Sequence, residues 1–135
     1  MPPVLDTKST RLALSSVQKA LQAYRYRFSS EEFLHRGIAL ALGNAGLAFE
    51  HEWVASAQCR FDFLLPDSGI VIEVKVAGAY GEALRQARRY LELVQCTAVL
   101  VASSKLWAPL DPAPESDILL SGKPLRVLRL KKQVF

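Results

Sequence analysis

The chain has 135 residues, half of them hydrophobic, which is enough for a single domain with a real apolar core and argues against disorder over most of its length. A formal net charge of +4 suits a polyanionic partner such as DNA, although many basic proteins bind none. There is neither a charged-then-apolar leader nor an apolar run of about 18 residues, so we expect a cytoplasmic protein that is neither secreted nor membrane-spanning.

Helical patterns dominate the first part of the chain. After a loose lead-in over residues 1–8, apolar spacing predicts a helix from Ser9 or Thr10. Its basic residues and tyrosines have two readings, a DNA-contacting surface or a solvated amphipathic helix, and we favour the second. Ser29 and Glu32 fit a capping box that starts a second helix, which ends near residue 43 or 44. Glu31 falls on the inward stripe of this helix and Glu32 does not.

The next run, residues 47–55, is predicted to be a strand with Phe49, His51 and Trp53 on one face and Glu50 and Glu52 on the other. An exposed carboxylate pair on an antiparallel strand is the default explanation for the two glutamates. His51, like His35 in the preceding helix, is assigned no role, because a lone histidine is more often a surface or packing residue than a ligand.

Two apolar runs, residues 60–66 and 70–76, flank a Pro-Asp-Ser-Gly turn and predict a β-hairpin. With Asp67 and Ser68 as the loop residues, Asp62 lies opposite Glu73, about 5 Å away between Cβ atoms. A bulge at Gly69 would shift this register by one residue. Two facing carboxylates attract a cation, and Lys75 shares a strand face with Glu73. In the same register Arg60 lies opposite Lys75.

The rest of the chain predicts a helix over about residues 80–94, a buried parallel strand over residues 97–103 and a right-handed crossover between the strands. Residues 104–124 hold four of the seven prolines and are predicted to be a long loop, followed by an edge strand over residues 125–130. Cys59 and Cys96 lack zinc-site spacing and are expected to be reduced thiols, with a disulfide as the less favoured alternative.

Asp62, followed after ten residues by Glu73-Val74-Lys75 on the second strand of a hairpin, resembles the core motif of the PD-(D/E)XK nuclease superfamily. The resemblance spans residues 29–104 and implies an α/β fold with a restriction-endonuclease-like αβββαβ core. Residues 1–28 would then be an N-terminal helical extension, and residues 105–135 a loop and C-terminal strand. Pro66-Asp67 matches the name of the motif, but Asp67 is better explained as a turn residue than as a metal ligand.

The resemblance implies a deoxyribonuclease that depends on Mg²⁺ or Mn²⁺. Asp62, Glu73, the Val74 carbonyl and Glu31 would hold the metal, and Lys75 would orient the attacking water. Gln86 and Tyr90 resemble the Gln-x-x-x-Tyr motif of exonuclease-like branches, in which the pair lines the DNA groove. Nucleic acid would also contact Tyr80, Arg85, Arg89 and Arg60, although a solvated face explains the arginines of this helix equally well.

Three alternatives stay open. The same fold without turnover would be a nucleic-acid-binding or assembly module, which the intact Asp62, Glu73 and Lys75 count against. An unrelated small α/β binding module would show no metal dependence. In the third alternative, Glu73 and Lys75 form a structural ion pair, with Arg60 and Asp62 on the same solvated sheet face. A homodimer, or membership of a larger nucleic-acid-processing complex, would suit cutting of both strands.

Overall fold

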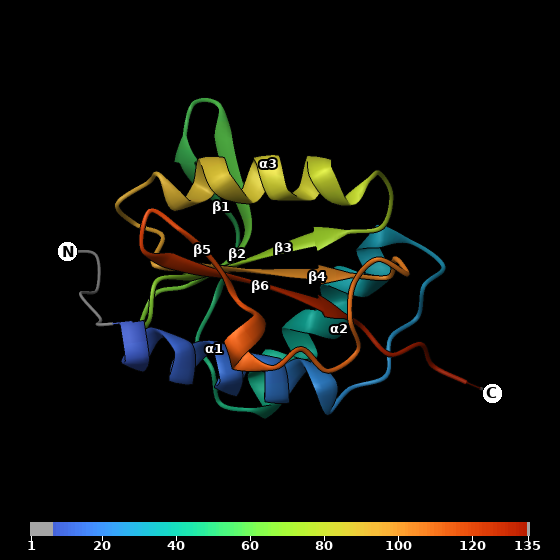
Figure 1. Cartoon of the computed structure of the whole chain (residues 1–135). Coiled ribbons are helices and arrows are strands. Elements are labelled where there is room, and N and C mark those ends of the chain that lie inside the picture. Colours follow the sequence, from blue (N-terminus) through green and yellow to red (C-terminus); the bar gives the residue numbers. More distant parts are fainter. Residues whose placement is uncertain (1–6, 135) are drawn as a thin grey trace.

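Helices cover both faces of a six-stranded mixed sheet in the computed structural model, which describes residues 7–134. Helices α1 (Thr7–Gln22) and α2 (Glu31–Asn44) lie on one face, and α3 (Tyr80–Leu91) lies on the other (Figure 1). The predicted α/β class is therefore confirmed. Within residues 7–134 no helix is both long and apolar enough to cross a membrane.

The sheet has the strand order β1-β2-β3-β4-β6-β5. Strands β3, β4 and β6 are parallel to one another, whereas β1–β2, β2–β3 and β5–β6 are antiparallel pairs. The strands are β1 (Glu50–Ser56), β2 (Cys59–Leu65), β3 (Ile70–Lys75), β4 (Ala98–Ser103), β5 (Ile118–Leu120) and β6 (Lys123–Arg129).

The predicted register of the β2–β3 hairpin is present over three pairs, from Leu65–Ile70 to Phe63–Ile72, but the pairing ends there and the predicted Asp62–Glu73 pair is not formed. The turn between them takes up residues 66–69 rather than the two residues expected. Gly69 has φ of 76°, a left-handed conformation that glycine adopts without steric cost, and its N–H donates to Leu65 O over 2.8 Å. The longer turn therefore closes without shifting the register.

The predicted buried strand is also present. Every residue of β4 is buried, because parallel neighbours flank it on both sides and helices cover both faces. Helix α3 makes the crossover from β3 to β4, and its buried residues Ala83, Ala87, Tyr90 and Leu91 recur at helical spacing.

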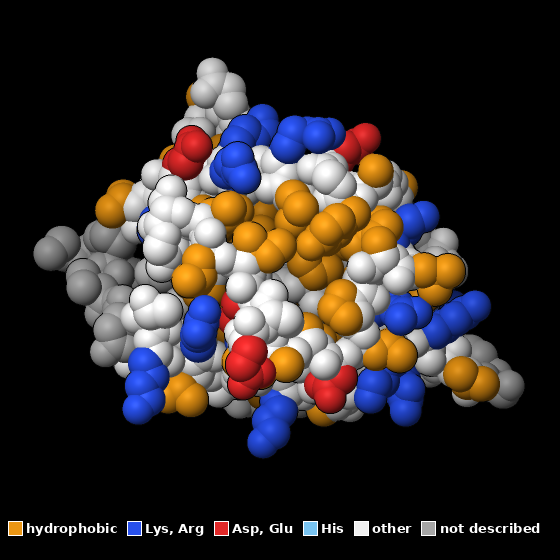
Figure 2. Space-filling model, in the orientation of Figure 1, with side chains coloured by type: hydrophobic (Ala, Val, Ile, Leu, Met, Phe, Trp, Pro, Cys, Tyr) orange, Lys and Arg blue, Asp and Glu red, His pale blue; other side chains and the backbone are white. Residues whose placement is uncertain are grey.

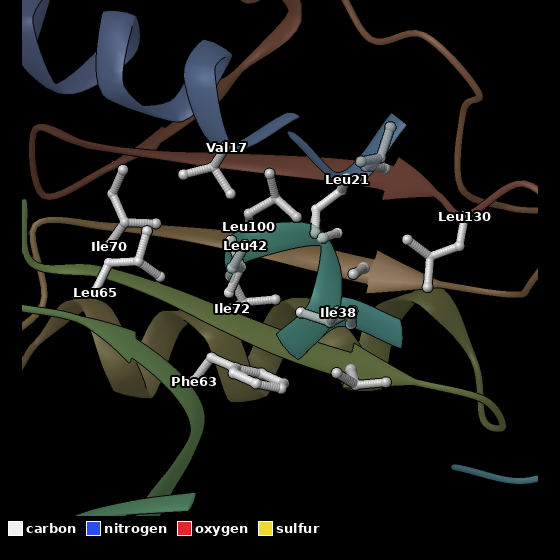
Figure 3. Packing of buried hydrophobic residues seen from close by; sticks show 14 of the residues in the cluster. Val17, Leu21, Ile38, Leu42, Phe63, Leu65, Ile70, Ile72, Leu100 and Leu130 are labelled. Atoms are coloured by element: carbon white, nitrogen blue, oxygen red, sulfur yellow. The ribbon is translucent and has the colours of Figure 1, made fainter. Parts of the chain in front are cut away.

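Two apolar clusters fill the two sides of the sheet. The first joins α1 and α2 to one sheet face and includes Leu21, Ile38, Phe63, Ile72 and Leu100 (Figure 3). The second joins α3 to the opposite face and includes Phe61, Val71, Tyr90, Val101 and Val127. Helix α1 is therefore part of the main core and not a separate appendage.

Other details of the fold also differ from the sequence-based expectations. Ser30, not Ser29, caps α2, because its Oγ accepts the Phe33 N–H over 3.2 Å, and Glu32 instead contacts Arg36 at 2.9 Å. The C-terminal strand β6 is internal and not an edge strand, since β5 pairs along its outer side. The predicted loop over residues 104–124 contains β5 and a 3₁₀ turn at Pro114–Ser116.

A buried ion pair fastens β6 to the segment that precedes it. Arg126 is 1% exposed and binds both carboxylate oxygens of Asp117, at 2.7 and 2.8 Å. The same guanidinium donates to Ser15 Oγ and Gln18 Oε1 of α1. One arginine from the C-terminal strand therefore holds the N-terminal helix and the segment before β5 in place.

Candidate functional site

The candidate site lies where β2 separates from β3. Backbone pairing between the two strands ends at Phe63–Ile72, while β3 continues to Lys75 alongside β4. At this opening a side chain replaces the backbone as the hydrogen-bond acceptor for β3: Asp62 Oδ2 accepts the Val74 N–H over 2.8 Å. That hydrogen bond fixes the carboxylate beside β3.

A local twist of the β1–β2 hairpin aims Asp62 into this gap. Phe63 belongs to the core on the α2 side and Phe61 to the core on the α3 side, although residues two apart normally share a strand face. The side chains of β2 therefore switch from one sheet face to the other between Phe61 and Phe63, at Asp62. On β1, Glu52 lies between the pairs His51–Phe63 and Trp53–Phe61 and has φ of 55°, which is uncommon for a residue other than glycine. The predicted simple alternation of faces along β1 is therefore wrong at Glu52.

Glu73 projects from β3 toward α3 and is 4% exposed. Its pKa is raised from 4.5 to about 8, chiefly by burial and then by the neighbouring charge of Asp62, while Lys75 and Tyr90 act in the opposite direction. Lys75 Nζ lies 3.4 Å from Glu73 Oε2. The Asp62, Glu73 and Lys75 predicted to act together are thus neighbours at one place, with the acid of β3 largely removed from water.

The Gln86–Tyr90 pair of α3 reaches the same carboxylate. Gln86 Nε2 donates to the Tyr90 hydroxyl over 2.7 Å, and that hydroxyl lies 3.0 Å from Glu73 Oε1. Tyr90 is 4% exposed, and its pKa is raised by burial and by Glu73. The Tyr90 hydroxyl therefore holds Glu73 from the α3 side, with Tyr90 itself buried and Gln86 half-buried.

A second group of ligand-type side chains faces Asp62 from α2. One ligand atom from each of Glu31, His35 and Asp62 lies within 4.8 Å of the other two. His35 Nε2 lies 3.5 Å from Glu31 Oε1 and is buried without a hydrogen-bond partner. Of the two glutamates at the start of α2, Glu31 is therefore the one near Asp62, although 56% of its side chain is exposed and it is not on an inward stripe.

No role was predicted from the sequence for His35 or His51, but the two side chains lie together in the structure. His35 Nδ1 and His51 Nε2 are 2.8 Å apart, and both rings pack on Phe63, with centroid distances of 5.5 and 4.7 Å. Each histidine looks isolated along the chain because one belongs to a helix and the other to a strand. The only signal in the sequence was that the helix carrying His35 and the strand carrying His51 come shortly before the strand of Asp62.

The arginines considered for contact with nucleic acid lie on two elements, α3 and β2. Arg85, Arg88 and Arg89 are exposed on the outer side of α3, and Figure 2 shows Lys and Arg side chains gathered along this upper edge. Arg60 pairs with Val54 of β1 rather than with Lys75, and its Nη1 lies 3.4 Å from Glu52 Oε2. The expected Arg60–Lys75 opposition is therefore wrong, because β2 has already left β3 at this point.

Tyr80 begins α3 and lies against Trp107, with ring centroids 5.4 Å apart. Both line a cavity of about 210 Å³ together with apolar residues of β5 and β6. Apolar side chains also gather below the basic edge of α3 in Figure 2. No described contact links Tyr80 to Glu73 or Lys75, so its predicted role at the site gains no support from the geometry.

The donor set around Asp62 fits a divalent cation. Two carboxylates and one imidazole nitrogen, from Glu31, Asp62 and His35, come together from α2 and β2, and hard divalent ions prefer such oxygen ligands. Glu73 of β3 is outside this group but lies close enough to Asp62 for their charges to interact. Glu73 and Asp62 are neighbouring carboxylates, and a bound cation would reduce the repulsion between their negative charges.

Searches of family models, curated proteins and solved structures return no significant match to this chain.

Proposed function

We propose that the protein is a metal-dependent nuclease that hydrolyses phosphodiester bonds of DNA on a restriction-endonuclease-like core. The observation that carries the proposal is the position of Asp62, which lies next to Glu73 and Lys75 of β3 on one side and to Glu31 and His35 of α2 on the other. The element order α2-β1-β2-β3-α3-β4 also agrees with the αβββαβ order expected for the PD-(D/E)XK core.

Asp62 and Glu73 would hold the metal, with Glu31 and His35 completing the ligand set from α2. The predicted Val74 carbonyl ligand remains part of this proposal. A divalent ion supplies two things in such a site: it lowers the pKa of a bound water, and it offsets charge on the phosphate. Mg²⁺ or Mn²⁺ suits a set dominated by carboxylates.

Lys75 is the residue of this chain best placed to act on the attacking water. Its side chain is one-quarter exposed and its ammonium lies against Glu73, so it can donate a hydrogen bond into the space beside the carboxylates and counter the negative charge that develops on phosphate. Ser103 Oγ donates to Lys75 O over 2.8 Å and anchors the backbone at this point.

Tyr90 and Gln86 would position Glu73 rather than touch substrate. The Tyr90 hydroxyl can donate its one proton either to Glu73 Oε1 or to Arg60 O, which lies 3.3 Å away, while it accepts from Gln86. The exposed arginines of α3 offer positive charge for the phosphate backbone of DNA.

The test is cleavage of labelled single-stranded, duplex and branched DNA in the presence of Mg²⁺, Mn²⁺ or chelator. We expect cleavage with either metal and none with chelator. Lys75→Ala should abolish cleavage while DNA binding persists. Lys8→Ala is the matched control, because Lys8 is an exposed lysine of α1 on the opposite sheet face, and this variant should cut normally.

Two outcomes would refute the proposal. Retention of DNA without cleavage of any substrate would identify a binding module on this fold. Cleavage that survives both chelator and Lys75→Ala would mean that the assembled Asp62–Glu73–Lys75 group is not the catalytic site.

A further inference from the structure

The two histidines beside Asp62 form a pair that the proposed catalytic roles leave unexplained. His35 comes from α2 and His51 from β1, and their ring centroids are 5.1 Å apart. Phe63 of β2 packs against both rings and limits their rotation. His35 Nδ1 and His51 Nε2, 2.8 Å apart, are within hydrogen-bond distance of each other.

That contact accommodates one proton, so one nitrogen donates and the other accepts. The other nitrogen of His35, Nε2, is the atom turned toward Glu31 and Asp62. An imidazole nitrogen can bind a metal only through its lone pair, and the ring proton must then sit on Nδ1. In that tautomer, His35 Nδ1–H donates its hydrogen bond to His51 Nε2.

We propose that His51 is a positioning residue that holds His35 as the Nδ1–H tautomer, so that the His35 Nε2 lone pair faces a divalent ion held with Glu31 and Asp62. The inference rests on the proposed metal site. It goes beyond that site by assigning a role to His51, whose side chain is 41% exposed and which contacts Asp62 in no described interaction.

The consequence concerns which metal the site prefers. A nitrogen ligand suits Mn²⁺ and other first-row transition ions, whereas Mg²⁺ favours oxygen ligands and keeps its waters. His51 would thus influence which divalent ion the site binds more tightly. Its loss should weaken Mn²⁺ binding more than Mg²⁺ binding, which a general loss of stability would not do.

The experiment measures Mn²⁺ and Mg²⁺ binding to the whole chain by calorimetry, for the native protein and for His51→Phe and His51→Gln. His51→Phe keeps an aromatic ring against Phe63 but removes the acceptor, and we expect Mn²⁺ affinity to fall about 10- to 100-fold with a smaller change for Mg²⁺. His51→Gln offers an amide oxygen as acceptor and should recover much of the Mn²⁺ affinity.

Trp53→Phe is the matched control, since Trp53 is the next aromatic of β1 but stacks on Phe61 on the other sheet face. It should leave the ratio of Mn²⁺ to Mg²⁺ affinity unchanged. Pulsed electron paramagnetic resonance of bound Mn²⁺ gives an independent readout. Nitrogen coupling should be present in the native protein, weakened in His51→Phe and absent in His35→Gln.

An unchanged affinity ratio in His51→Phe, absence of nitrogen coupling in the native protein, or absence of metal binding would each overturn the inference. These results are separable from the nuclease test. Cleavage that depends on Mg²⁺ and Lys75, with an unchanged metal ratio in His51→Phe, would refute the role of His51 alone. Nitrogen-coupled Mn²⁺ without cleavage of any DNA would refute the nuclease and leave the role of His51 standing.

Discussion

Replacing Glu73 with glutamine should stabilise the metal-free protein progressively as the pH rises. Glu73 is almost fully buried, and its pKa is raised from 4.5 to about 8, first by burial and then by Asp62. Between these values the folded state keeps a proton that the unfolded state has lost. The unfolded state therefore binds fewer protons, and the free energy of unfolding falls as the pH rises through this interval. Below pH 4.5 both states are protonated and the effect disappears.

The size of the effect follows from the interval. At about 1.4 kcal/mol per pH unit, the span from 4.5 to about 8 corresponds to roughly 5 kcal/mol of lost stability when Glu73 is forced to ionise. Glutamine resembles the protonated carboxyl in shape and stays neutral. The stability of Glu73→Gln relative to the native protein should therefore rise by several kcal/mol across this range.

Urea unfolding in chelator, repeated in steps from about pH 5 to about pH 8.5, measures this difference directly. Glu50→Gln is the control, because Glu50 is an exposed carboxylate of β1 and its difference curve should stay nearly flat. A flat difference curve for Glu73→Gln would refute the reasoning, since Glu73 would then be ionised at no cost in the folded protein.

Divalent metal should offset part of this loss of stability in the native protein only. At a concentration ten times the dissociation constant, bound Mg²⁺ or Mn²⁺ would add about 1.4 kcal/mol to the free energy of unfolding. Glu73→Gln, having lost a ligand, should gain much less. Equal stabilisation of both proteins by the metal would place the cation elsewhere.

Three further substitutions test other parts of the structure by chemical or thermal unfolding. Glu52→Gly should stabilise the protein by about 0.5–1 kcal/mol, because glycine removes the cost of the positive φ at this position, and a loss of stability would contradict the strain. Gly37→Ala should destabilise by about 1–3 kcal/mol despite the higher helix propensity of alanine, since the new Cβ would lie 2.7 Å from Tyr26 Cδ1; a gain in melting temperature would show that the tyrosine moves aside. Arg126→Met should cost about 3 kcal/mol, because buried Asp117 would keep only the more distant Arg11 Nε, 3.8 Å from its Oδ2; adding Asp117→Asn should restore part of that loss, whereas two additive losses would argue against the pair.

Local patterns in the sequence were sufficient for much of the central fold. The β2–β3 register followed from two apolar runs and a Pro-Asp-Ser-Gly turn, and β4 followed from an apolar run after a helix. The neighbourhood of Asp62, Glu73 and Lys75 could be predicted because the hairpin carries all three within a few residues.

Contacts between distant elements could not be predicted in this way. The His35–His51 hydrogen bond depends on how closely α2 approaches β1, and neither histidine stands in a recognisable motif. The positive φ of Glu52 accompanies the local change of face in the β1–β2 hairpin, and no local preference of glutamate favours it. Strand β6 looked like a basic edge strand because Arg126 interrupts its apolar residues, but the partner that allows this arginine to be buried, Asp117, lies in a proline-containing segment earlier in the chain.

The contacts of Arg126 have a consequence for the order in which the protein can fold during synthesis. Helix α1 is made first, yet its residues Ser15 and Gln18 receive hydrogen bonds from a residue 111 and 108 positions later. Tyr26 likewise donates its N–H to Lys131 O at the far end of the chain. The apolar face of α1 therefore has no complete docking surface until β6 has left the ribosome, and contacts over so long a separation form slowly. Synthesis of β6 would complete the core, and a chain that lacked β6 would leave Ser15 and Gln18 without their Arg126 donor.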